Sequence, residues 1–494
     1  MLIGATGMKY LKKYPFQVFL FLHFLVWSLL PLMRKALPMD SIEAISWGKY
    51  CDFGTNKHPP LSGWLADFFY NVIGFEHPYA IYALSQICVL IGFIYIYRLA
   101  RGFLSKDRAI FSVMLLEGVI YYGFSAIEYN VNVVSLALWP MCVFYFYRAL
   151  KQDNLKDWTL TGLLAGLNLF NKYTSGVLLI SMVVFMLYNP NARKKLLTLK
   201  PYFAGLVCFV VILPHLIWLW QHDFSSLSYF VGRGSKAGFE NWPILKHIVY
   251  PVKFLGAQAL FALGTALIYF IAQIKEKKLQ VKATRTQKDF LLIVGVLPLV
   301  LMVAVSLLGG VKLKSMWGFP ALYLTGVLLF VFRPVKLTDN FKKKMYIGVY
   351  LMMLLMAMAQ AMIIYFNKSD KFQLDAKAFG KQMEQIWYAK NGKMPFEYVA
   401  GDVWWANNVA LFAPSKPKPI IWGDLKQNPW FDENDVAEKG ALVVAPDKSE
   451  YNHIRKKMKF VSTPSVLNVT VQNRSGKTKT KTVYYGFYNV SGER

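Results

Sequence analysis

The sequence predicts a mainly α-helical, polytopic membrane protein with a small C-terminal α/β domain. Of the 494 residues, 55% are hydrophobic and 16% are aromatic, whereas soluble domains are roughly 45–50% apolar. Eleven apolar segments approach the length of about 20 residues that a spanning helix needs. After residue 366 the apolar runs shrink to strand length and charged residues become more frequent. We therefore expect a transmembrane domain over residues 1–366 and a soluble α/β domain over residues 367–494.

The eleven candidate spans set the expected topology. Their cores lie at residues 16–33, 79–99, 109–126, 131–149, 159–171, 173–188, 201–220, 248–274, 289–309, 317–333 and 345–366. The first span follows a basic N-terminus and has no small-residue cleavage pattern behind it, so we expect it to be retained in the protein.

The charged loops predict the orientation of these spans. Loops rich in Lys and Arg follow every second span, at residues 98–108, 148–158, 189–200, 275–288 and 333–344. Such loops stay in the cytoplasm, so the sequence predicts a multi-pass protein of the cytoplasmic (inner) membrane with a cytoplasmic N-terminus. The alternate loops and the C-terminal domain then face outward, into the periplasm or its equivalent. Arg34 and Lys35 are exceptions, because they follow the first span on the outer side.

The C-terminal part combines short apolar runs with one longer amphipathic run. Strands are expected at residues 396–401, 418–423, 441–447 and 483–490, and a helix at residues 376–390. These elements predict the small α/β domain.

Composition and motifs exclude several classes of function. The net charge of +28 does not indicate nucleic-acid binding, because many of the cations lie in short loops between apolar spans, as topology signals do. The chain has no Walker, dinucleotide-binding, HExxH or GxSxG motif, so ATP hydrolysis, nicotinamide chemistry and serine hydrolysis lack support.

The first outward loop carries the most unusual polar residues. Asp40 and Glu43 are three residues apart in "MDSIEAISWGKY", which places both carboxylates on one face of a helix. Such a pair suits proton abstraction or a divalent cation, while the alternative is that Asp40 caps the helix and Glu43 completes a capping box. In "KHPPL", Lys57 and His58 precede two prolines that fix the backbone. They suit an anionic group, or belong to an ordinary turn.

The later outward loops add further polar candidates near the ends of spans. Glu128 and Asn130 in "SAIEYNVN" suit hydrogen bonds to a polyol or a cap on the next helix. Lys172 in "FNKYTSG" suits a cavity or is a loop charge.

Cations on the outer side also need a reason, since the charge rule would keep them inside. Lys312 and Lys314 in "GGVKLKSMWG" and Arg233 in "VGRGSKAG" are candidates for binding a phosphate. Trp317 follows the two lysines and either contacts substrate or belongs to the aromatic belt of the membrane interface.

Several stretches together resemble the GT-C type membrane glycosyltransferases that use polyprenyl-phosphate sugars. This family includes dolichyl-phosphate-mannose protein mannosyltransferases and bacterial lipid A aminoarabinose transferases. The resemblance is carried by "LPMDSIEAISWGKYCDFGTNKHPPLSGWL", "EYNVNVVSLALWP", "GLLAGLNLFNKYTSGVLL", "PHLIWLWQHDFSSLSY", "VKLKSMWGFPALY" and "VAGDVWWANNVALFAPSKPKP". It covers nearly the whole chain and is strongest over residues 38–222.

The resemblance implies roles for the candidate residues. Asp40 takes the place of the catalytic base, Glu43 that of a second acidic or aromatic residue, and Lys312 or Lys314 that of the cation at the donor phosphate, with Lys57 and Arg233 nearby. His58 hydrogen-bonds donor or acceptor, and Glu128, Asn130, Lys172 and Trp317 are expected to bind substrate. Many relatives have Asp near the start of the fourth helix, where this chain has Asn130 and Asn132.

The resemblance also implies the partners of the protein. They are a polyprenyl (undecaprenyl) phosphate sugar donor, a glycolipid acceptor such as lipid A or a protein acceptor, and membrane lipids, with inversion at the anomeric carbon. No cofactor is required by the motifs, and participation of a divalent cation stays open. The alternatives are a transporter or flippase of a lipid-linked sugar, a ligase or acyltransferase with His58 as base, and a structural assembly protein.

Overall fold

The computed structural model describes residues 13–50, 52–235, 242, 244–279, 283–424, 428, 431–459 and 461–488, with the backbone alone at residues 233–235. Up to residue 366 the named elements are all helical. They are α2 (Pro15–Leu29), η1 (Leu30–Met33), α3 (Met39–Tyr50), α4 (Leu61–Asp67), η2 (Phe68–Ile73), α5 (Tyr79–Ala100), α6 (Lys106–Met114), η3 (Leu115–Gly118), α7 (Val131–Gln152), α8 (Leu155–Asn171), η4 (Tyr173–Ser175), α9 (Gly176–Tyr188), α10 (Pro190–Lys195), α11 (Lys200–Gln221), α12 (Ser225–Ser235), α13 (Lys246–Phe261), α14 (Leu263–Ala272), α15 (Arg285–Gly295), α16 (Leu297–Gly309), η5 (Ser315–Leu322), α17 (Thr325–Phe332) and α18 (Asp339–Phe366).

Every predicted span lies on helical structure, but not every one is a long helix. Within the described residues, α2 with η1, α5, α7, α11 and α18 are each long and apolar enough to cross a membrane. The pairs α13–α14, α15–α16 and η5–α17 qualify together, although they are bent by 47°, 44° and 52°. Five to eight spans therefore meet the length and composition criteria. The predicted segments at 159–171 and 173–188 are helical but shorter, and the segment at 109–126 is helical up to Gly118 and continues in turns. The number of eleven spans stays a prediction.

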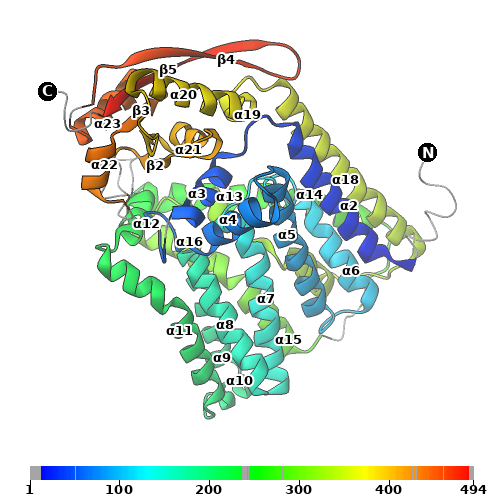
Figure 1. Ribbon diagram of the computed structural model, residues 1–494. Coiled ribbons are helices and arrows are strands. Elements are labelled where there is room, and N and C mark those ends of the chain that lie inside the picture. Colours follow the sequence, from blue (N-terminus) through cyan, green and yellow to red (C-terminus); the bar gives the residue numbers. More distant parts are fainter. Residues whose placement is uncertain are drawn as a thin grey trace.

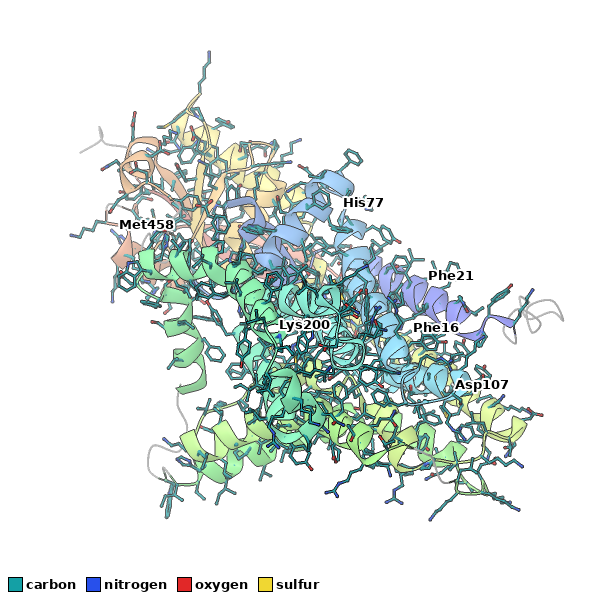
Figure 2. All side chains as sticks on the ribbon, turned by 90° about the horizontal axis from the view of Figure 1, so that it is seen from below. Phe16, Phe21, His77, Asp107, Lys200 and Met458 are labelled. Carbon is teal, nitrogen blue, oxygen red and sulfur yellow. The ribbon has the colours of Figure 1, made fainter. Side chains whose placement is uncertain are left out.

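The helices present an apolar surface to their surroundings, as expected for a multi-pass membrane protein. Phe21 on α2, labelled in Figure 2, is 61% exposed, and Trp220 on α11 is 77% exposed. In soluble proteins such large exposed apolar patches are rare. The mainly α fold predicted from hydropathy is thus confirmed.

A buried polar cluster fixes one part of the helical core. Glu117 on η3 is fully buried. One oxygen of its carboxylate lies 2.6 Å from Nδ1 of His23, and the other accepts a hydrogen bond from Nε1 of Trp27 at 2.8 Å. Both partners belong to α2, so the cluster ties η3 to the first span. The segment after η3, residues 119–130, leads directly to the candidate site.

The C-terminal part contains α19 (Asp370–Gln373), α20 (Ala376–Asn391), α21 (Val403–Phe412), α22 (Glu433–Lys439), α23 (Lys448–Lys457) and a five-stranded sheet. The strands are β1 (Tyr398–Gly401), β2 (Lys418–Ile421), β3 (Ala441–Ala445), β4 (Ser465–Gln472) and β5 (Thr478–Tyr488), in the order β2-β1-β3-β5-β4. β1 is parallel to β2 and β3, with Ala400 opposite Ile420 and Val443, and β5 is antiparallel to β3 and β4. The four predicted strands and the predicted helix are present, so the predicted α/β character is confirmed.

This C-terminal part covers one end of the helical bundle (Figure 1). Helix α21 packs against α3, which therefore lies between the sheet-containing part and the bundle (Figure 1). The turn between β4 and β5 reaches back to the end of the first span, where Nε of Arg474 donates to the carbonyl oxygen of Met33 at 3.0 Å. It also reaches the end of α18, where Nδ2 of Asn473 donates to the carbonyl oxygen of Phe366 at 2.9 Å.

Candidate active site

One face of α3 forms a wall of a cavity of about 440 Å³. Asp40, Glu43 and Trp47 follow one another at intervals of three and four residues, so they lie on the same face of the helix, and all three line the cavity. The helix does not use Asp40 as its cap. It begins at Met39, and the amide of Ile42 bonds to the carbonyl of Pro38. The expected alternative role of Asp40 as the N-cap is therefore wrong.

The approach of α3 to α4 depends on a pair of glycines. A Cβ atom on Gly48 would lie 2.1 Å from the carbonyl oxygen of Gly63, a backbone atom that has no other position to take. Only the absence of a side chain allows the two helices to come this close. The contact brings the chain before α4, which carries Lys57 and His58, against the Asp40–Trp47 face.

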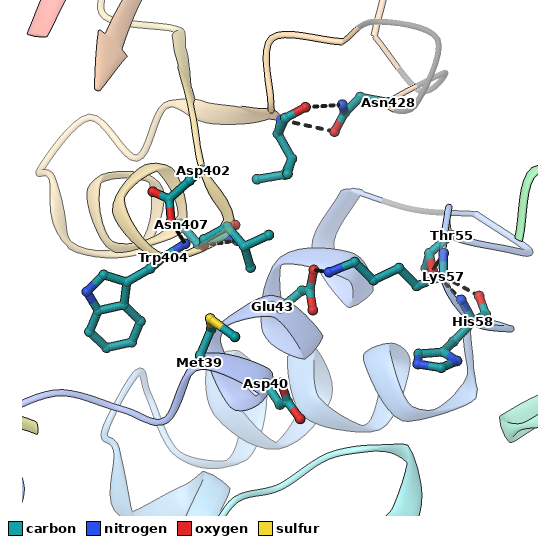
Figure 3. A network of polar contacts seen from close by, with 12 residues as sticks. Met39, Asp40, Glu43, Thr55, Lys57, His58, Asp402, Trp404, Asn407 and Asn428 are labelled. Carbon is teal, nitrogen blue, oxygen red and sulfur yellow. Dashed lines mark hydrogen bonds and ion pairs between the residues drawn. The ribbon is translucent and has the colours of Figure 1, made fainter. Parts of the chain in front are cut away.

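The segment before α4 is a tight corner held by Thr55. Its hydroxyl oxygen accepts hydrogen bonds from the amides of Lys57 at 3.1 Å and His58 at 2.9 Å, and its own amide donates to the carbonyl of His58. The two prolines that follow restrict the backbone further. Lys57 and His58 thus leave the corner in fixed directions, and both line the cavity (Figure 3).

Lys57 forms an ion pair with Glu43, its Nζ donating to Oε1 (Figure 3). The Lys57 side chain is only 16% exposed and that of Glu43 8%. Burial alone would disfavour the ammonium, but the Glu43 carboxylate more than offsets this and raises the pKa of Lys57 above its usual value. The cavity therefore holds a permanent cation near Trp47, whose ring centroid lies 5.8 Å from Nζ.

Glu128 and Asn130 meet the start of α3 from the other side. Oε1 of Glu128 accepts a hydrogen bond from the amide of Asp40 at 3.2 Å, and Nδ2 of Asn130 approaches Oδ2 of Asp40 at 3.4 Å. Burial, and then the nearby Asp40 carboxylate, raise the pKa of Glu128. Asn130 is at the same time the N-cap of α7, because its Oδ1 accepts from the amide of Asn132 at 2.8 Å. Asn130 thus fills both expected roles, because it caps α7 and also lines the cavity.

The remaining walls come from the ends of other helices. Lys172 follows α8, is 4% exposed, and its Nζ donates to Oδ1 of Asn132. Trp317 on η5 is 8% exposed and stacks on Phe230 of α12, with ring centroids 5.4 Å apart. Both line the cavity, so neither is an ordinary surface loop or belt residue.

Two cations in the cavity were not among the predicted site residues. Arg34 follows the first span, and Lys371 belongs to α19 in the C-terminal part. The sequence does mark Arg34, as a cation on the wrong side for the charge rule. Lys371 has no local signal, because only the tertiary structure brings α19 to the cavity.

Two predicted phosphate ligands, Lys312 and Lys314, do not line the cavity. Lys312 and Lys314 are half-buried in the segment before η5, and of this region only Met316 and Trp317 line the cavity. The side chain of Arg233 lies outside the described residues. The cations that do line the cavity are Arg34, Lys57, Lys172 and Lys371.

The donor set for a metal ion is incomplete. Within the part of the chain that the structure describes, no group of three or more His, Cys, Asp and Glu side chains is close enough to hold a metal ion. The arrangement offers a carboxylate, Asp40, in a cavity that has cations at several points of its wall, which suits transfer of a group away from a phosphate.

The chain is similar to known proteins in sequence and in structure. The family model described as dolichyl-phosphate-mannose-protein mannosyltransferase matches residues 57–218. Lipopolysaccharide core galacturonosyltransferase RgtA of Rhizobium johnstonii is 23% identical over 191 residues, and RgtB of the same organism 26% over 190 residues. These matches cover 38% and 37% of RgtA and RgtB, and 38% and 37% of this chain.

The structural match extends over the whole chain. The crystal structure of ArnT from Cupriavidus metallidurans bound to undecaprenyl phosphate has a TM-score of 0.64 at 12% identity, covering 99% of this chain and all of ArnT. The apo structure of ArnT gives 0.62 at 11% identity. At this identity the match shows a shared fold. The sequence and structural matches agree with the resemblance of the motifs, whose strongest part overlaps residues 57–218.

Proposed function

We propose that this chain, a GT-C type membrane glycosyltransferase by its sequence matches and its fold, transfers a sugar from undecaprenyl phosphate or a similar polyprenyl phosphate to an envelope acceptor. The acceptor class is lipid A, lipopolysaccharide or another glycolipid. The observation that carries the proposal is the cavity that unites Asp40 with several cations. The names of RgtA and RgtB, and the undecaprenyl phosphate bound to ArnT, support the lipid-linked donor and the lipopolysaccharide acceptor.

Asp40 is the general base of the proposed reaction. A hydroxyl oxygen of the acceptor attacks the anomeric carbon, the bond from that carbon to the phosphate oxygen breaks, and the hydroxyl proton passes to the Asp40 carboxylate. Attack from the side opposite the phosphate inverts the anomeric centre. The polyprenyl phosphate leaves with one more negative charge than it carried as a diester, so nearby cations lower the barrier.

Lys57 is the cation for the leaving phosphate, and Glu43 positions it. The Thr55 corner and the ion pair fix the ammonium before donor arrives, which removes most of the ordering cost at binding. His58, beside Trp47 with ring centroids 5.8 Å apart, is placed to hydrogen-bond donor or acceptor. Glu128, Asn130, Lys172 and Trp317 complete the walls around the sugars.

The topology follows the charge pattern of the loops. We place the N-terminus in the cytoplasm and the cavity, with the C-terminal domain over it, at the outer face of the cytoplasmic membrane. A flippase is the alternative. Transporters commonly bind substrate near the midplane between repeated halves, whereas this cavity lies at helix ends and is lined in part by Lys371 and Phe372 of the C-terminal part.

The proposal is tested in cells by mass spectrometry of envelope lipids. Cells with the wild-type chain are expected to contain a glycolipid heavier by one sugar residue than cells without it. The Asp40→Asn variant, which keeps the shape of the side chain, should lose this product although the protein is present in the membrane. An unchanged product in that variant would contradict the role of Asp40, and identical lipids with and without the wild-type chain would contradict the proposed transfer.

A further inference from the structure

The cations of the cavity form separate groups along α3. Lys57 lies at the Trp47 end, with Nζ 5.8 Å from the indole centroid. Lys371 lies at the Met39 end, with Nζ 4.0 Å from the Met39 sulfur, and Arg34 is beside it. Lys57 also donates to Glu43, so its ammonium and that of Lys371 are held by different residues of α3, four positions apart, which corresponds to about 6 Å along the axis.

Arg34 is held rigidly against the C-terminal part. Its Nε donates to the carbonyl of Ala36 at 3.2 Å, its Nη2 donates to the carbonyl of Lys371 at 2.7 Å, and its guanidinium lies 4.1 Å from the ring centroid of Phe372. The amides of Lys35 and Ala36 donate to the carbonyl of Phe372 at 3.0 and 3.4 Å. These contacts hold residues 34–36 and α19 together. Arg34 uses two of its five N–H groups in them, which leaves three for another partner.

The charges of Arg34 and Lys371 are not compensated by a salt bridge. Among the described residues, neither side chain has a carboxylate oxygen within ion-pair distance, whereas Lys57 has Glu43. Two carboxyl groups lie near these cations: Glu128, which accepts a hydrogen bond from the amide of Asp40, and Asp402, which is near Lys371. Burial and the Asp40 charge raise the pKa of Glu128, while Arg34 and Lys371 act in the opposite direction.

The lining of the cavity thus carries more positive charge than its own carboxylates neutralise. It includes four cations and three carboxylates, namely Arg34, Lys57, Lys172 and Lys371 against Asp40, Glu43 and Glu128. A guanidinium beside an ammonium, both facing a cavity, is a favourable geometry for a carboxylate or phosphate.

We propose that Arg34 and Lys371 form a second anion subsite, distinct from the Lys57 site, which binds a carboxylate or phosphate carried by a sugar substrate. The subsite makes the enzyme selective for an anionic carbohydrate. Two sources supply such a group: the C6 carboxylate of a uronic acid on the donor, or a phosphate on the glycolipid acceptor. This inference rests on the proposed function for the identity of the substrates, while the subsite itself is tested by binding.

The binding test uses soluble and lipid probes that differ only in the anion. The full chain in lipid nanodiscs is titrated with galacturonic acid 1-phosphate and galactose 1-phosphate, and separately with lipid A and its dephosphorylated form. Fluorescence of Trp47 and Trp317, which line the cavity, reports binding. In one of the two pairs, the wild-type protein should bind the form with the additional anion at least tenfold more tightly.

The variants assign this preference to the subsite. In the double variant Arg34→Gln/Lys371→Gln the preference should fall to below threefold, with the affinity for the neutral member kept. Lys368→Gln, which removes an exposed cation two residues before α19, should keep the full preference. The pair of probes that responds identifies the donor or the acceptor as the source of the anion.

Two results would overturn the subsite. One is the absence of any preference in both pairs with the wild-type protein, and the other is a preference that survives in the double variant. A loss of affinity for charged and neutral probes alike would also count against it, as a purely structural effect. The wild-type protein can prefer the anionic probe, and the double variant lose that preference, while no sugar is transferred from undecaprenyl-phosphate galacturonic acid or galactose. That combination would contradict the proposed transfer and support the anion subsite.

Discussion

Replacement of Lys57 tests how the cavity holds the donor phosphate. The Lys57 ammonium is paired with Glu43, with both side chains mostly buried. A hydrogen bond to a charged group contributes about 1.5–3 kcal/mol. Since about 1.4 kcal/mol is a factor of ten in affinity, Lys57→Met should weaken binding of undecaprenyl phosphate by roughly 10- to 150-fold. Glu43→Gln should not weaken it, because the amide oxygen still accepts from Lys57 while the competing negative charge is gone.

The assay is a titration of the purified protein in nanodiscs with undecaprenyl phosphate. Lys49→Met is the matched control, because Lys49 is an exposed cation on α3 and does not line the cavity. Because the pKa of Lys57 is raised, its side chain stays a charged ammonium up to and beyond the ordinary pKa of lysine. The charge is lost only when the pH rises through the higher, folded-state value. Binding through Lys57 should therefore be constant between pH 7 and pH 9.

An affinity for undecaprenyl phosphate that is the same in Lys57→Met and in the wild type would refute this reasoning. The phosphate would then be held elsewhere, and Lys312 and Lys314, which the sequence indicated, would be the next cations to replace. A loss in Glu43→Gln as large as that in Lys57→Met would instead show that the intact ion pair, and not the free ammonium, is what binding requires.

Other features of the molecule give further expectations. Gly48→Ala should reduce undecaprenyl phosphate binding, because its Cβ would lie 2.1 Å from a backbone oxygen of α4. Gly176→Ala should leave binding unchanged, because no atom lies within 4 Å of the new Cβ. The nanodisc titration with undecaprenyl phosphate checks both variants. Glu117→Ala should destabilise the protein by about 3–5 kcal/mol, because it leaves a buried imidazole and a buried indole unpaired; a midpoint of thermal inactivation equal to wild type would contradict that. Burial raises the pKa of Asp402 to about 6, so stability should fall as the pH rises from about 4 to 6, by on the order of 3 kcal/mol. Hydrogen exchange of the α21 amides, corrected for the intrinsic exchange rates at each pH, measures this change in stability. In the Asp402→Asn variant the stability should no longer depend on pH in this range.

Part of the site was predictable because local sequence encodes it. Helical spacing places Asp40, Glu43 and Trp47 on one face, whatever α3 packs against. The two prolines after His58 indicated a fixed corner. The pairing of Lys57 with Glu43 was not predictable, because the two residues are 14 positions apart and meet only through the glycine contact between α3 and α4.

Other parts depend on tertiary contacts that no local pattern reveals. Lys371 lies 332 residues after Met39 and reaches it only because the C-terminal part packs on the segment after the first span. Strand β4 was not predicted either. Its apolar residues Leu467, Val469 and Val471 alternate with polar ones, so it lacks the continuous apolar run that marked the other strands.

The most direct test of the central claim is a transfer reaction with purified components. The protein in nanodiscs receives a radiolabelled undecaprenyl-phosphate sugar and lipid A, and both glycosylated lipid and released undecaprenyl phosphate are quantified. Equal amounts of the two products are expected from the wild type and from Asp52→Asn, which alters an exposed carboxylate outside the cavity. Asp40→Asn should be about 10²- to 10⁴-fold slower, the usual contribution of a general base, with donor affinity within a few-fold of wild type. Transfer at the wild-type rate in Asp40→Asn would contradict the account.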